Sequence, residues 1–251
     1  MKQRSVAAVC TFGLCFGGAF FLLMYYLPIF FQSVKNSSAT RSGIQLLPIL
    51  LSTVVSSIVM GGLVTAVGYY TPFLIASTAL FCIGTGLLTM YSVDISNGKW
   101  IGYQIIAGAG VGAGFQVPMT AVQTVLAQED IPIGSAAVFF FQNLGGALFI
   151  SVGQSVFQNG LVAYLQQNVP DIPPSLVLGA GATQIRVVLD RIGKANELAQ
   201  VVAAYMSGLR DSYRVSLALT LAAFVASLFV EWRSVKHGKK DVKEVGPAIG
   251  A

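Results

Sequence analysis

One stretch of sequence, WIGYQIIAGAGVGAGFQVPMTAVQTVL at residues 100–126, decides the fold class of this chain. Its 27 residues include no Asp, Glu, Lys, Arg or His. A helix needs about 20 mainly apolar residues to cross the hydrocarbon core of a bilayer, and charged side chains are costly there. The stretch therefore predicts a membrane-spanning helix, and similar stretches recur along the chain.

The composition of the whole chain agrees with this interpretation. Of the 251 residues, 55% are hydrophobic and 10% are charged, and the mean hydropathy is +0.72. A soluble domain usually has about 25% charged residues, so a soluble fold of this size would lack the charge to cover its surface. The composition excludes an ordinary soluble enzyme, a disordered protein and a nucleic-acid-binding domain.

Six apolar blocks have the length of a membrane span. We therefore predict an all-α membrane protein with a six-transmembrane-helix bundle over residues 1–232. The predicted spans are residues 5–31, 44–67, 71–91, 100–126, 133–157 and 213–232. The first block follows Lys2 and Arg4 as a signal sequence would, but it is too long and has no obvious cleavage site. The chain is expected to be an integral, multi-pass membrane protein.

Basic residues predict the orientation of these spans. Six spans place both termini on one side of the membrane, where seven lysines and arginines flank them: Lys2, Arg4, Arg233, Lys236, Lys239, Lys240 and Lys243. The short loops on the other side hold three, namely Lys35, Arg41 and Lys99. Because basic residues favour the cytosolic side, we expect cytosolic termini and a basic cytosolic tail at residues 233–251. Binding of anionic lipid by this tail is a secondary expectation.

One connection between spans is long, at residues 158–212, and is expected on the non-cytosolic side. Its first half contains Pro170, Pro173 and Pro174. Its second half repeats apolar residues at three- and four-residue steps, which predicts one or two amphipathic helices at the membrane surface or over the end of the bundle. The alternative is a helical linker with no activity of its own.

Small residues and prolines within the spans predict sites of close packing or bending. Glycines four residues apart share a helix face and let a second helix approach closely, whereas a proline removes a backbone donor and bends a helix. The candidate packing or hinge residues are Gly108, Gly110, Gly112, Gly114, Gly145, Gly146, Pro48 and Pro118. The glycine run at 108–114 follows no predicted strand, so it is not interpreted as a nucleotide-binding motif.

Uncharged amides within the spans are the main candidates for a functional site. Gln104 and Gln116 lie in the fourth predicted span, and Gln142 and Asn143 lie in the fifth. An amide in hydrocarbon needs a hydrogen-bond partner or a water-filled cavity. Hydrogen bonding between helices and the lining of a pocket both remain open for these side chains.

Ionisable and catalytic groups are missing from the predicted spans. No Asp, Glu, Lys, Arg or His lies near the middle of any span, so proton-coupling residues are not expected in this chain. Cys10, Cys15 and Cys82 lie inside apolar blocks and His237 is the single histidine, which argues against disulfides and metal sites. No nucleophile has a base within plausible reach. We therefore expect no enzyme activity, catalytic residue, metal or cofactor.

Several motifs along the chain resemble one family of transporters. They are YYLPIFFQ at residues 25–32, GKWIGYQ at 98–104 with the glycine run and QVP that follow it, FQNLGG at 141–146, and Ala204–Tyr205 before the last span. Together they are similar to the second half of a fourteen-span drug:proton antiporter of the major facilitator superfamily, in its fungal multidrug and toxin efflux branch. The resemblance covers about residues 25–232.

One motif of this family is degenerate here. In such a half, the cytosolic loop between the second and third spans carries Gly-x-x-x-Asp-Arg-x-Gly-Arg-Arg. Gly61 and Gly68 match its two glycines, whereas the four charged positions, 65, 66, 69 and 70, hold uncharged residues. The resemblance therefore does not extend to a network of gating charges in this loop.

The resemblance implies a site and a set of partners. Such transporters bind small organic compounds near the midplane, between two six-helix bundles, and export them by alternating access. The implied partners are a small-molecule substrate, the lipid bilayer and an N-terminal six-helix bundle, in the same or another chain, that provides proton coupling. The implied substrate-facing residues are Gln104, Gln116, Gln142, Asn143, Tyr103 and Phe139. A packing role for each of them is the alternative.

Two functions follow as hypotheses. The first is the C-terminal half of a proton-coupled exporter of drugs or fungal toxins, in the plasma membrane or, alternatively, the vacuolar membrane. A fragment of a longer gene product is the simplest explanation of a single half, and a natural half-transporter is the alternative. The second hypothesis is a membrane scaffold or regulator of a full-length homologue that does not itself transport.

Overall fold

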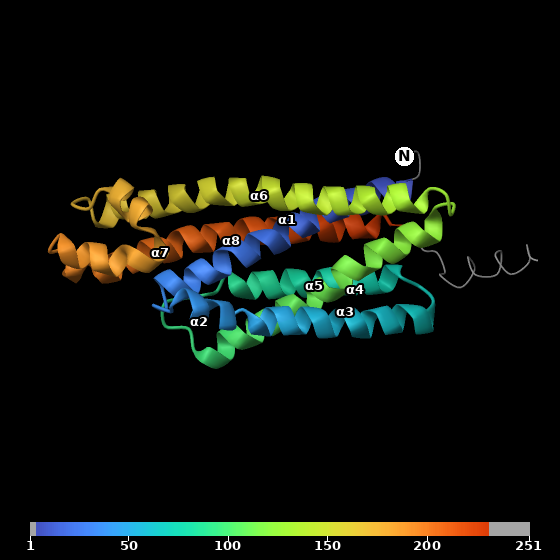
Figure 1. Cartoon of the computed structure of the whole chain (residues 1–251), viewed down its shortest axis with the longest axis horizontal. Coiled ribbons are helices and arrows are strands. Elements are labelled where there is room, and N and C mark those ends of the chain that lie inside the picture. The colour runs from blue at the N-terminus through green and yellow to red at the C-terminus, as the bar shows by residue number, and fades with distance from the viewer. Residues whose placement is uncertain (1–3, 231–251) are drawn as a thin grey trace, which may run out of the picture.

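The computed structural model describes residues 4–230, and every regular element in this range is a helix (Figure 1). The elements are α1 (Arg4–Ser33), α2 (Ala39–Ile44), α3 (Leu47–Val67), α4 (Thr71–Leu88), α5 (Asn97–Val125), α6 (Ile131–Asn168), α7 (Pro174–Arg191), a 3-10 turn (Ala195–Glu197) and α8 (Leu198–Leu228). The predicted basic tail at residues 233–251 and the last two residues of the sixth predicted span lie outside the described residues.

Five helical segments in the described range are long and apolar enough to cross a membrane. They are Val6–Ser33, Ala39–Val67, Thr71–Leu88, Asn97–Thr124 and Ile131–Asn168. They overlap the first five predicted spans. The sixth predicted span lies in α8, which is less apolar because Arg210, Asp211 and Arg214 lie along it. The chain is thus an all-helical membrane protein, and the crossing by α8 stays a prediction.

The long helices run side by side and alternate in direction (Figure 1). α1 begins and α8 finishes at the same end of the bundle, which we call the N–C end. The last part of α6, α7 and the first part of α8 project beyond the other helices at the opposite end, which we call the extended end. Residues 4 and 228 therefore lie at the same end of the bundle.

The bundle consists of two groups of three helices. α1, α6 and α8 pack against one another, and α5 packs between α3 and α4. Contact between α4 and α8 joins the groups along one side, whereas α1 and α5 touch only lightly on the other. This second side is formed by α1 and α5 and is flanked by α3 and α6. At the edge of the bundle, α3 leaves Leu51, Val55 and Ile58 exposed by 60% or more.

The helices extend well beyond the predicted ends of the spans. α6 continues to Asn168 rather than stopping near residue 157, and α8 begins at Leu198 rather than near residue 213. Much of the predicted loop 158–212 therefore consists of helix ends, with α7 between them. Hydropathy locates the part of a helix that prefers lipid, but a helix continues into water wherever its residues allow it.

The predicted amphipathic pattern is divided between the second part of α7, which covers the extended end, and the first part of α8. Val177, Ile185 and Leu189 of this helix are buried, while Asp190 and Arg191 are exposed. Gly181 interrupts the helix with a φ of 68°, a backbone conformation that suits glycine. α7 thus consists of two short helical pieces whose apolar sides face the bundle.

Glycines in α5 let this helix lie against three neighbours at once. A Cβ atom added to Gly108 or Gly112 would overlap atoms of α3. One added to Gly110 would overlap the backbone of α4, and one added to Gly114 would overlap the ring of Phe16 in α1. Small residues allow such close approach, which strengthens the packing of helices in a membrane.

The crossing of α1 and α6 also depends on glycine. A Cβ atom on Gly145 would overlap the backbone of Leu14 in α1, and one on Gly146 would overlap the ring of Phe21. Because a backbone cannot move aside as a flexible side chain can, Gly145 is the more restrictive of the two positions. The two glycines hold α1 and α6 at a distance that no larger residue permits.

The two prolines that were predicted as hinges occupy different positions. Pro48 is the second residue of α3, where the helix does not need its missing amide hydrogen, so it starts a helix instead of bending one. The short helix α2 precedes it, and the predicted start of the second span at residue 44 becomes a break between two helices. Pro118 lies inside α5 and is buried. There it removes one hydrogen bond of the helix interior.

Candidate functional site

The six side chains predicted to face a substrate come from two helices. α5 carries the first three and α6 the other three: Tyr103, Gln104, Gln116, Phe139, Gln142 and Asn143. Tyr103 and Gln116 are 13 residues apart, which is about 20 Å along a helix. The structure therefore does not gather the six residues at one point within this bundle.

Gln104 and Gln142 are buried inside the bundle. Gln104 is fully buried near Tyr91, but its amide lacks hydrogen-bond geometry with any described residue. Gln142 packs against Gly13 of α1, and its Nε2 atom also has no hydrogen-bond partner among the described residues. Buried amides without partners cost free energy. A polar ligand group beside either amide would lower that cost.

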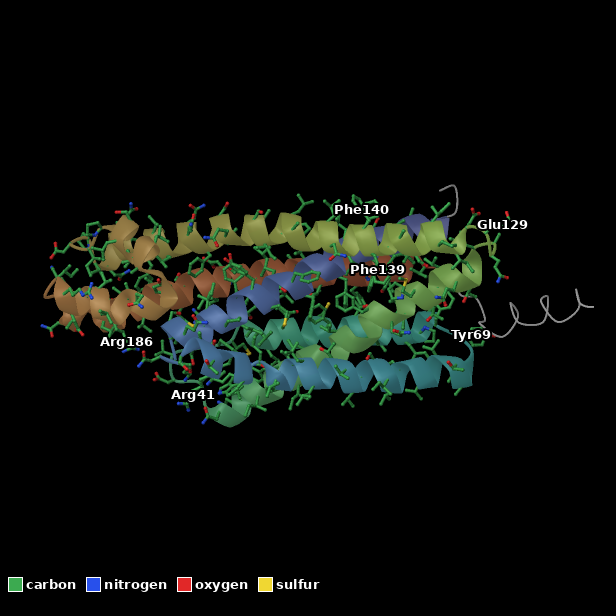
Figure 2. All side chains as sticks on the ribbon, viewed as in Figure 1. Arg41, Tyr69, Glu129, Phe139, Phe140 and Arg186 are labelled. Atoms are coloured by element: carbon green, nitrogen blue, oxygen red, sulfur yellow. The ribbon has the colours of Figure 1, made fainter. Side chains whose placement is uncertain are left out.

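Gln116, Asn143 and Phe139 are exposed on the surface of the bundle. Asn143 Nδ2 donates a hydrogen bond of 2.8 Å to the backbone oxygen of Phe139, which satisfies part of its amide within α6. The exposed amide of Gln116 makes no hydrogen bond with a described residue. Figure 2 shows Phe139 and its neighbour Phe140 on different sides of α6, as a rotation of about 100° per residue requires.

An aromatic cluster lies between α1 and α5 and includes Phe115, the residue before Gln116. The rings of Phe16 and Phe20 in α1 pack against Phe115 in α5, with centroid distances of 5.4 and 5.1 Å. Phe20 and Phe115 are only partly buried, so this cluster reaches the surface between the two helices. Nothing in the sequence pairs Phe20 with Phe115, although the position of Phe115 next to Gln116 was an available signal.

A second aromatic cluster lies toward the extended end and includes Tyr103. Tyr91 contacts Phe30 in α1, Tyr213 in α8 and Tyr103 in α5, at centroid distances of 4.8, 6.0 and 6.3 Å. Lys35 Nζ holds the adjoining loop by donating to two of its backbone carbonyls, at 2.8 and 2.9 Å. Tyr103 is therefore packed among other rings, unlike the exposed Gln116.

Charged residues lie along α8 around the start of the sixth predicted span, residues 213–232, and not near the middle of that span. Arg210, Asp211 and Arg214 lie in the central part of this 31-residue helix. Arg214 pairs with Asp211 at 2.7 Å, and Arg210 donates to the backbone oxygen of Tyr91 at 3.5 Å. Tyr91 follows the end of α4, so these charges lie toward the extended end. Within residues 4–230, no cluster of three His, Cys, Asp or Glu is arranged to hold a metal ion.

The chain is similar in sequence to transport proteins over nearly its whole length. It is 47% identical over 240 residues to the MFS-type efflux pump MFS1 of Arthroderma benhamiae and 43% identical over 236 residues to the MFS-type transporter astH of Aspergillus oryzae. It is also 40% identical over 241 residues to the aspyridones efflux protein of Neocamarosporium betae. No family model matches the chain.

These alignments cover 94–96% of this chain but only 41–44% of the length of each relative. The chain thus spans less than half the length of the curated relatives it matches. Its long apolar helices agree with their transport function, and none of the three names describes an enzyme. The chain is therefore an integral membrane protein that is similar in sequence, over almost all of its own length, to one part of several MFS-type efflux pumps and transporters.

Proposed function

We propose that this chain is the C-terminal six-helix half of a fourteen-span, proton-coupled exporter of small organic compounds. A second six-helix bundle, in the same or another chain, would complete the transporter. The names of the relatives, which are efflux pumps and transporters, support the direction and class of transport. The match to 41–44% of their length leaves room for a second bundle of similar size.

The exposed amide of Gln116 carries this proposal. It lies well inside α5, on a helix long and apolar enough to cross a membrane. An amide that faces lipid loses hydrogen bonds to water without gaining others, so intramembrane polar groups usually face a protein interior or a water-filled cavity. The surface around Gln116 therefore fits the wall of a cavity between two bundles better than a surface coated by lipid.

The residues around Gln116 suit an organic substrate. Phe20 and Phe115 add partly exposed aromatic rings, and Phe115 directly precedes Gln116 in α5. Pockets for small organic molecules are mostly apolar and aromatic, with a few polar groups that fix the orientation of the ligand. Asn143 and Phe139 offer the same combination on α6. We assign to these side chains recognition by shape and hydrogen bonding.

Proton coupling is assigned to the second bundle. The five candidate spans carry Arg41 and Lys99 only near their ends at the extended side, and the charges of α8 also lie toward that end. Proton relays normally use ionisable groups near the midplane. In this proposal the present half contributes substrate contacts, and the two halves rock about the bound compound.

Efflux measurements test the proposal. Cells expressing the complete protein that contains this chain are loaded with rhodamine 6G, and dye release is followed with and without a protonophore. Gln116→Leu should slow release about tenfold, because a lost hydrogen bond in a desolvated site costs about 1–3 kcal/mol. Gln128→Leu, in the exposed loop after α5, is the matched control and should leave release unchanged.

Two outcomes would overturn the proposal. Release that continues at full rate in the presence of the protonophore would exclude proton coupling. Unchanged release in both Gln116→Leu and Asn143→Leu would remove the assigned substrate contacts, and would favour the scaffold or regulator function instead. Surface expression of each variant is measured in the same cells, so that a loss of protein is not mistaken for a loss of transport.

A further inference from the structure

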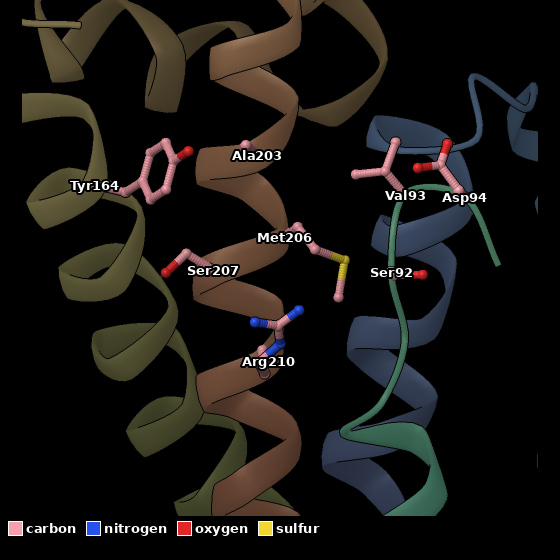
Figure 3. Close-up of a pocket in the computed structure, with 8 residues that line it drawn as sticks. All are labelled: Ser92, Val93, Asp94, Tyr164, Ala203, Met206, Ser207 and Arg210. Atoms are coloured by element: carbon pink, nitrogen blue, oxygen red, sulfur yellow. The ribbon is translucent and has the colours of Figure 1, made fainter. Parts of the chain in front are cut away.

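A pocket of about 380 Å³ lies at the extended end, away from the residues assigned to the substrate. α6 contributes Tyr164, α8 contributes Met206, Ser207 and Arg210, and the loop after α4 contributes Val93. Figure 3 shows Tyr164, Ser207 and Arg210 on the helices at one side and the loop across from them. The pocket thus combines one cation and one carboxylate, that of Asp94, with the hydroxyl groups of Ser92, Tyr164 and Ser207 and an apolar remainder.

Arg210 is available to a ligand in this pocket. The two ion pairs among the described residues are Lys194–Asp171 and Arg214–Asp211, and neither includes Arg210. Among the described residues, its side chain donates one long hydrogen bond, of 3.5 Å, to the Tyr91 carbonyl. Asp94 lies at the far side of the pocket from Arg210 (Figure 3). The guanidinium of Arg210 therefore forms no ion pair with a carboxylate of the described residues.

The position of Arg210 along α8 matches the depth of a lipid headgroup. From Arg210 to the end of α8 at Leu228 there are 18 residues, which corresponds to about 27 Å of helix. The hydrocarbon core of a bilayer is about 30 Å thick. If α8 crosses with its end at the N–C surface, Arg210 lies at the opposite boundary between hydrocarbon and headgroups.

An apolar surface continues along α8 from this pocket toward the N–C end. Leu221 and Leu228 follow Arg210 by 11 and 18 residues, which are about three and five helical turns, so they lie on the same helix face. They are 50% and 53% exposed. An arginine that forms no ion pair, followed by exposed leucines on the same helix face, matches the two parts of a phospholipid, its phosphate and its acyl chain.

We propose that this pocket binds the phosphate group of an anionic phospholipid at the extended end of the bundle. Arg210 supplies the charge, and the hydroxyl groups of Ser207 and Tyr164 donate hydrogen bonds to phosphate oxygens. The acyl chains lie along Leu221 and Leu228. A free phosphate shares the headgroup chemistry, but the apolar stripe favours the lipid. The site is separate from the proposed substrate path and does not depend on it.

Native mass spectrometry of the detergent-purified chain tests the site. The probes are dioleoyl phosphatidic acid, dioleoylglycerol, which lacks the phosphate, and inorganic phosphate. One molecule of phosphatidic acid should bind most tightly, and Arg210→Gln should weaken its binding about tenfold or more, as expected for a lost charge-assisted hydrogen bond. Arg210→Lys keeps the charge without the forked geometry of the guanidinium. Its affinity for phosphatidic acid should lie between those of the parent and Arg210→Gln.

Arg214→Gln is the matched control. It removes a neighbouring, more exposed arginine that already pairs with Asp211, and should leave phosphatidic acid binding within about twofold of the parent, as a surface ion pair contributes little. Ser207→Ala and Tyr164→Phe provide smaller changes that preserve the helices, and each should weaken binding several-fold.

The proposal would be overturned if Arg210→Gln and Arg214→Gln weakened phosphatidic acid binding equally. It would also be overturned if dioleoylglycerol bound as tightly as phosphatidic acid. Binding of inorganic phosphate with the same dependence on Arg210 would support the anion site but assign it a soluble ligand. Circular dichroism of each variant identifies any loss of fold. If Arg210→Gln unfolds, unchanged binding in the Ser207→Ala, Tyr164→Phe double variant is sufficient to overturn the assignment.

Discussion

Ser216 Oγ in α8 donates a hydrogen bond of 3.0 Å to the backbone oxygen of Ala19 in α1, and both residues are fully buried. The two residues are 197 positions apart in the chain. The last long helix is thus hydrogen-bonded directly to the first. A hydrogen bond of this kind between helices in a membrane contributes on average about 0.6 kcal/mol and at most about 1.7 kcal/mol.

Ser216→Ala is therefore expected to destabilise the bundle by about 0.6–1.7 kcal/mol, since it removes the donor without adding bulk. Thermal unfolding in detergent measures the change. Ser57→Ala is the control, because the Ser57 hydroxyl binds only the carbonyl of Val54 within its own helix. An equal shift in the two variants would mean that the bond between α1 and α8 contributes nothing specific.

Gly145→Ala should be more damaging than Gly86→Ala. The new methyl group at residue 145 would overlap the backbone of Leu14, and overpacking of this kind costs about 1–3 kcal/mol. At Gly86 the same methyl group meets nothing within 4 Å, so this variant should be neutral or slightly stabilised. Thermal midpoints of the two variants, measured side by side, check the prediction. A Gly145→Ala variant as stable as the parent would show that α1 and α6 can separate without cost.

The burial of Tyr205 predicts that the folded protein loses stability in strong alkali. Tyr205 lies in α8 outside the predicted sixth span, is almost fully buried, and donates a hydrogen bond of 3.3 Å to the Val177 backbone oxygen. Burial raises the pKa of Tyr205 to about 12, from an ordinary value of 10.0. The folded protein therefore keeps this proton at a pH where the unfolded chain loses it.

The sign of the effect follows from proton linkage. The protonated Tyr205 hydroxyl contributes to the free energy of unfolding. This contribution is fully present below pH 10 and is lost as the pH rises toward 12, and it amounts to roughly 1.4 kcal/mol for each unit of difference between the folded and unfolded pKa. The unfolding free energy of the parent should fall across this interval, and that of Tyr205→Phe should fall less. Chemical unfolding at several pH values measures both. Identical slopes would exclude a contribution from Tyr205.

The two ends of the bundle should label from opposite sides of the membrane. Arg41 and Arg186 lie toward the extended end, and Tyr69 and Glu129 lie at the N–C end (Figure 2). In a background without native cysteines, a membrane-impermeant maleimide should label Arg41→Cys and Arg186→Cys in intact cells. Tyr69→Cys and Glu129→Cys should react only after permeabilisation, if the N–C end is cytosolic.

The reverse pattern of labelling would invert the orientation, and labelling of all four positions from one side would contradict the alternation of the helices. Replacing Cys10, Cys15 and Cys82 is required because all three are free thiols. If Arg41→Cys and Arg186→Cys were labelled from different sides of the membrane, the extended part of α6–α8 would not lie at the same end of the bundle as α2.

Long apolar blocks were sufficient to predict an all-helical membrane protein and the approximate positions of five long apolar helices. The physical reason is that hydrocarbon excludes charge and unpaired backbone groups, so composition and length alone report a crossing. The same argument could not locate the ends of α6 and α8. Water accepts both a helix and a loop, so hydropathy does not distinguish them in the segment 158–212.

The sequence by itself also identified glycines and amides as the residues to examine, because spaced glycines let helices pack closely and an amide in hydrocarbon needs a hydrogen-bond partner. Only the tertiary structure decided their surroundings. Gly108 and Gly110 are two residues apart but contact different helices, and Gln104 is buried while Gln116 is exposed on the same helix. The pairing of Phe20 with Phe115, and the pocket around Arg210, join segments that are distant in the chain. Such contacts depend on how helices pack against one another, which the periodicity of a single helix does not determine.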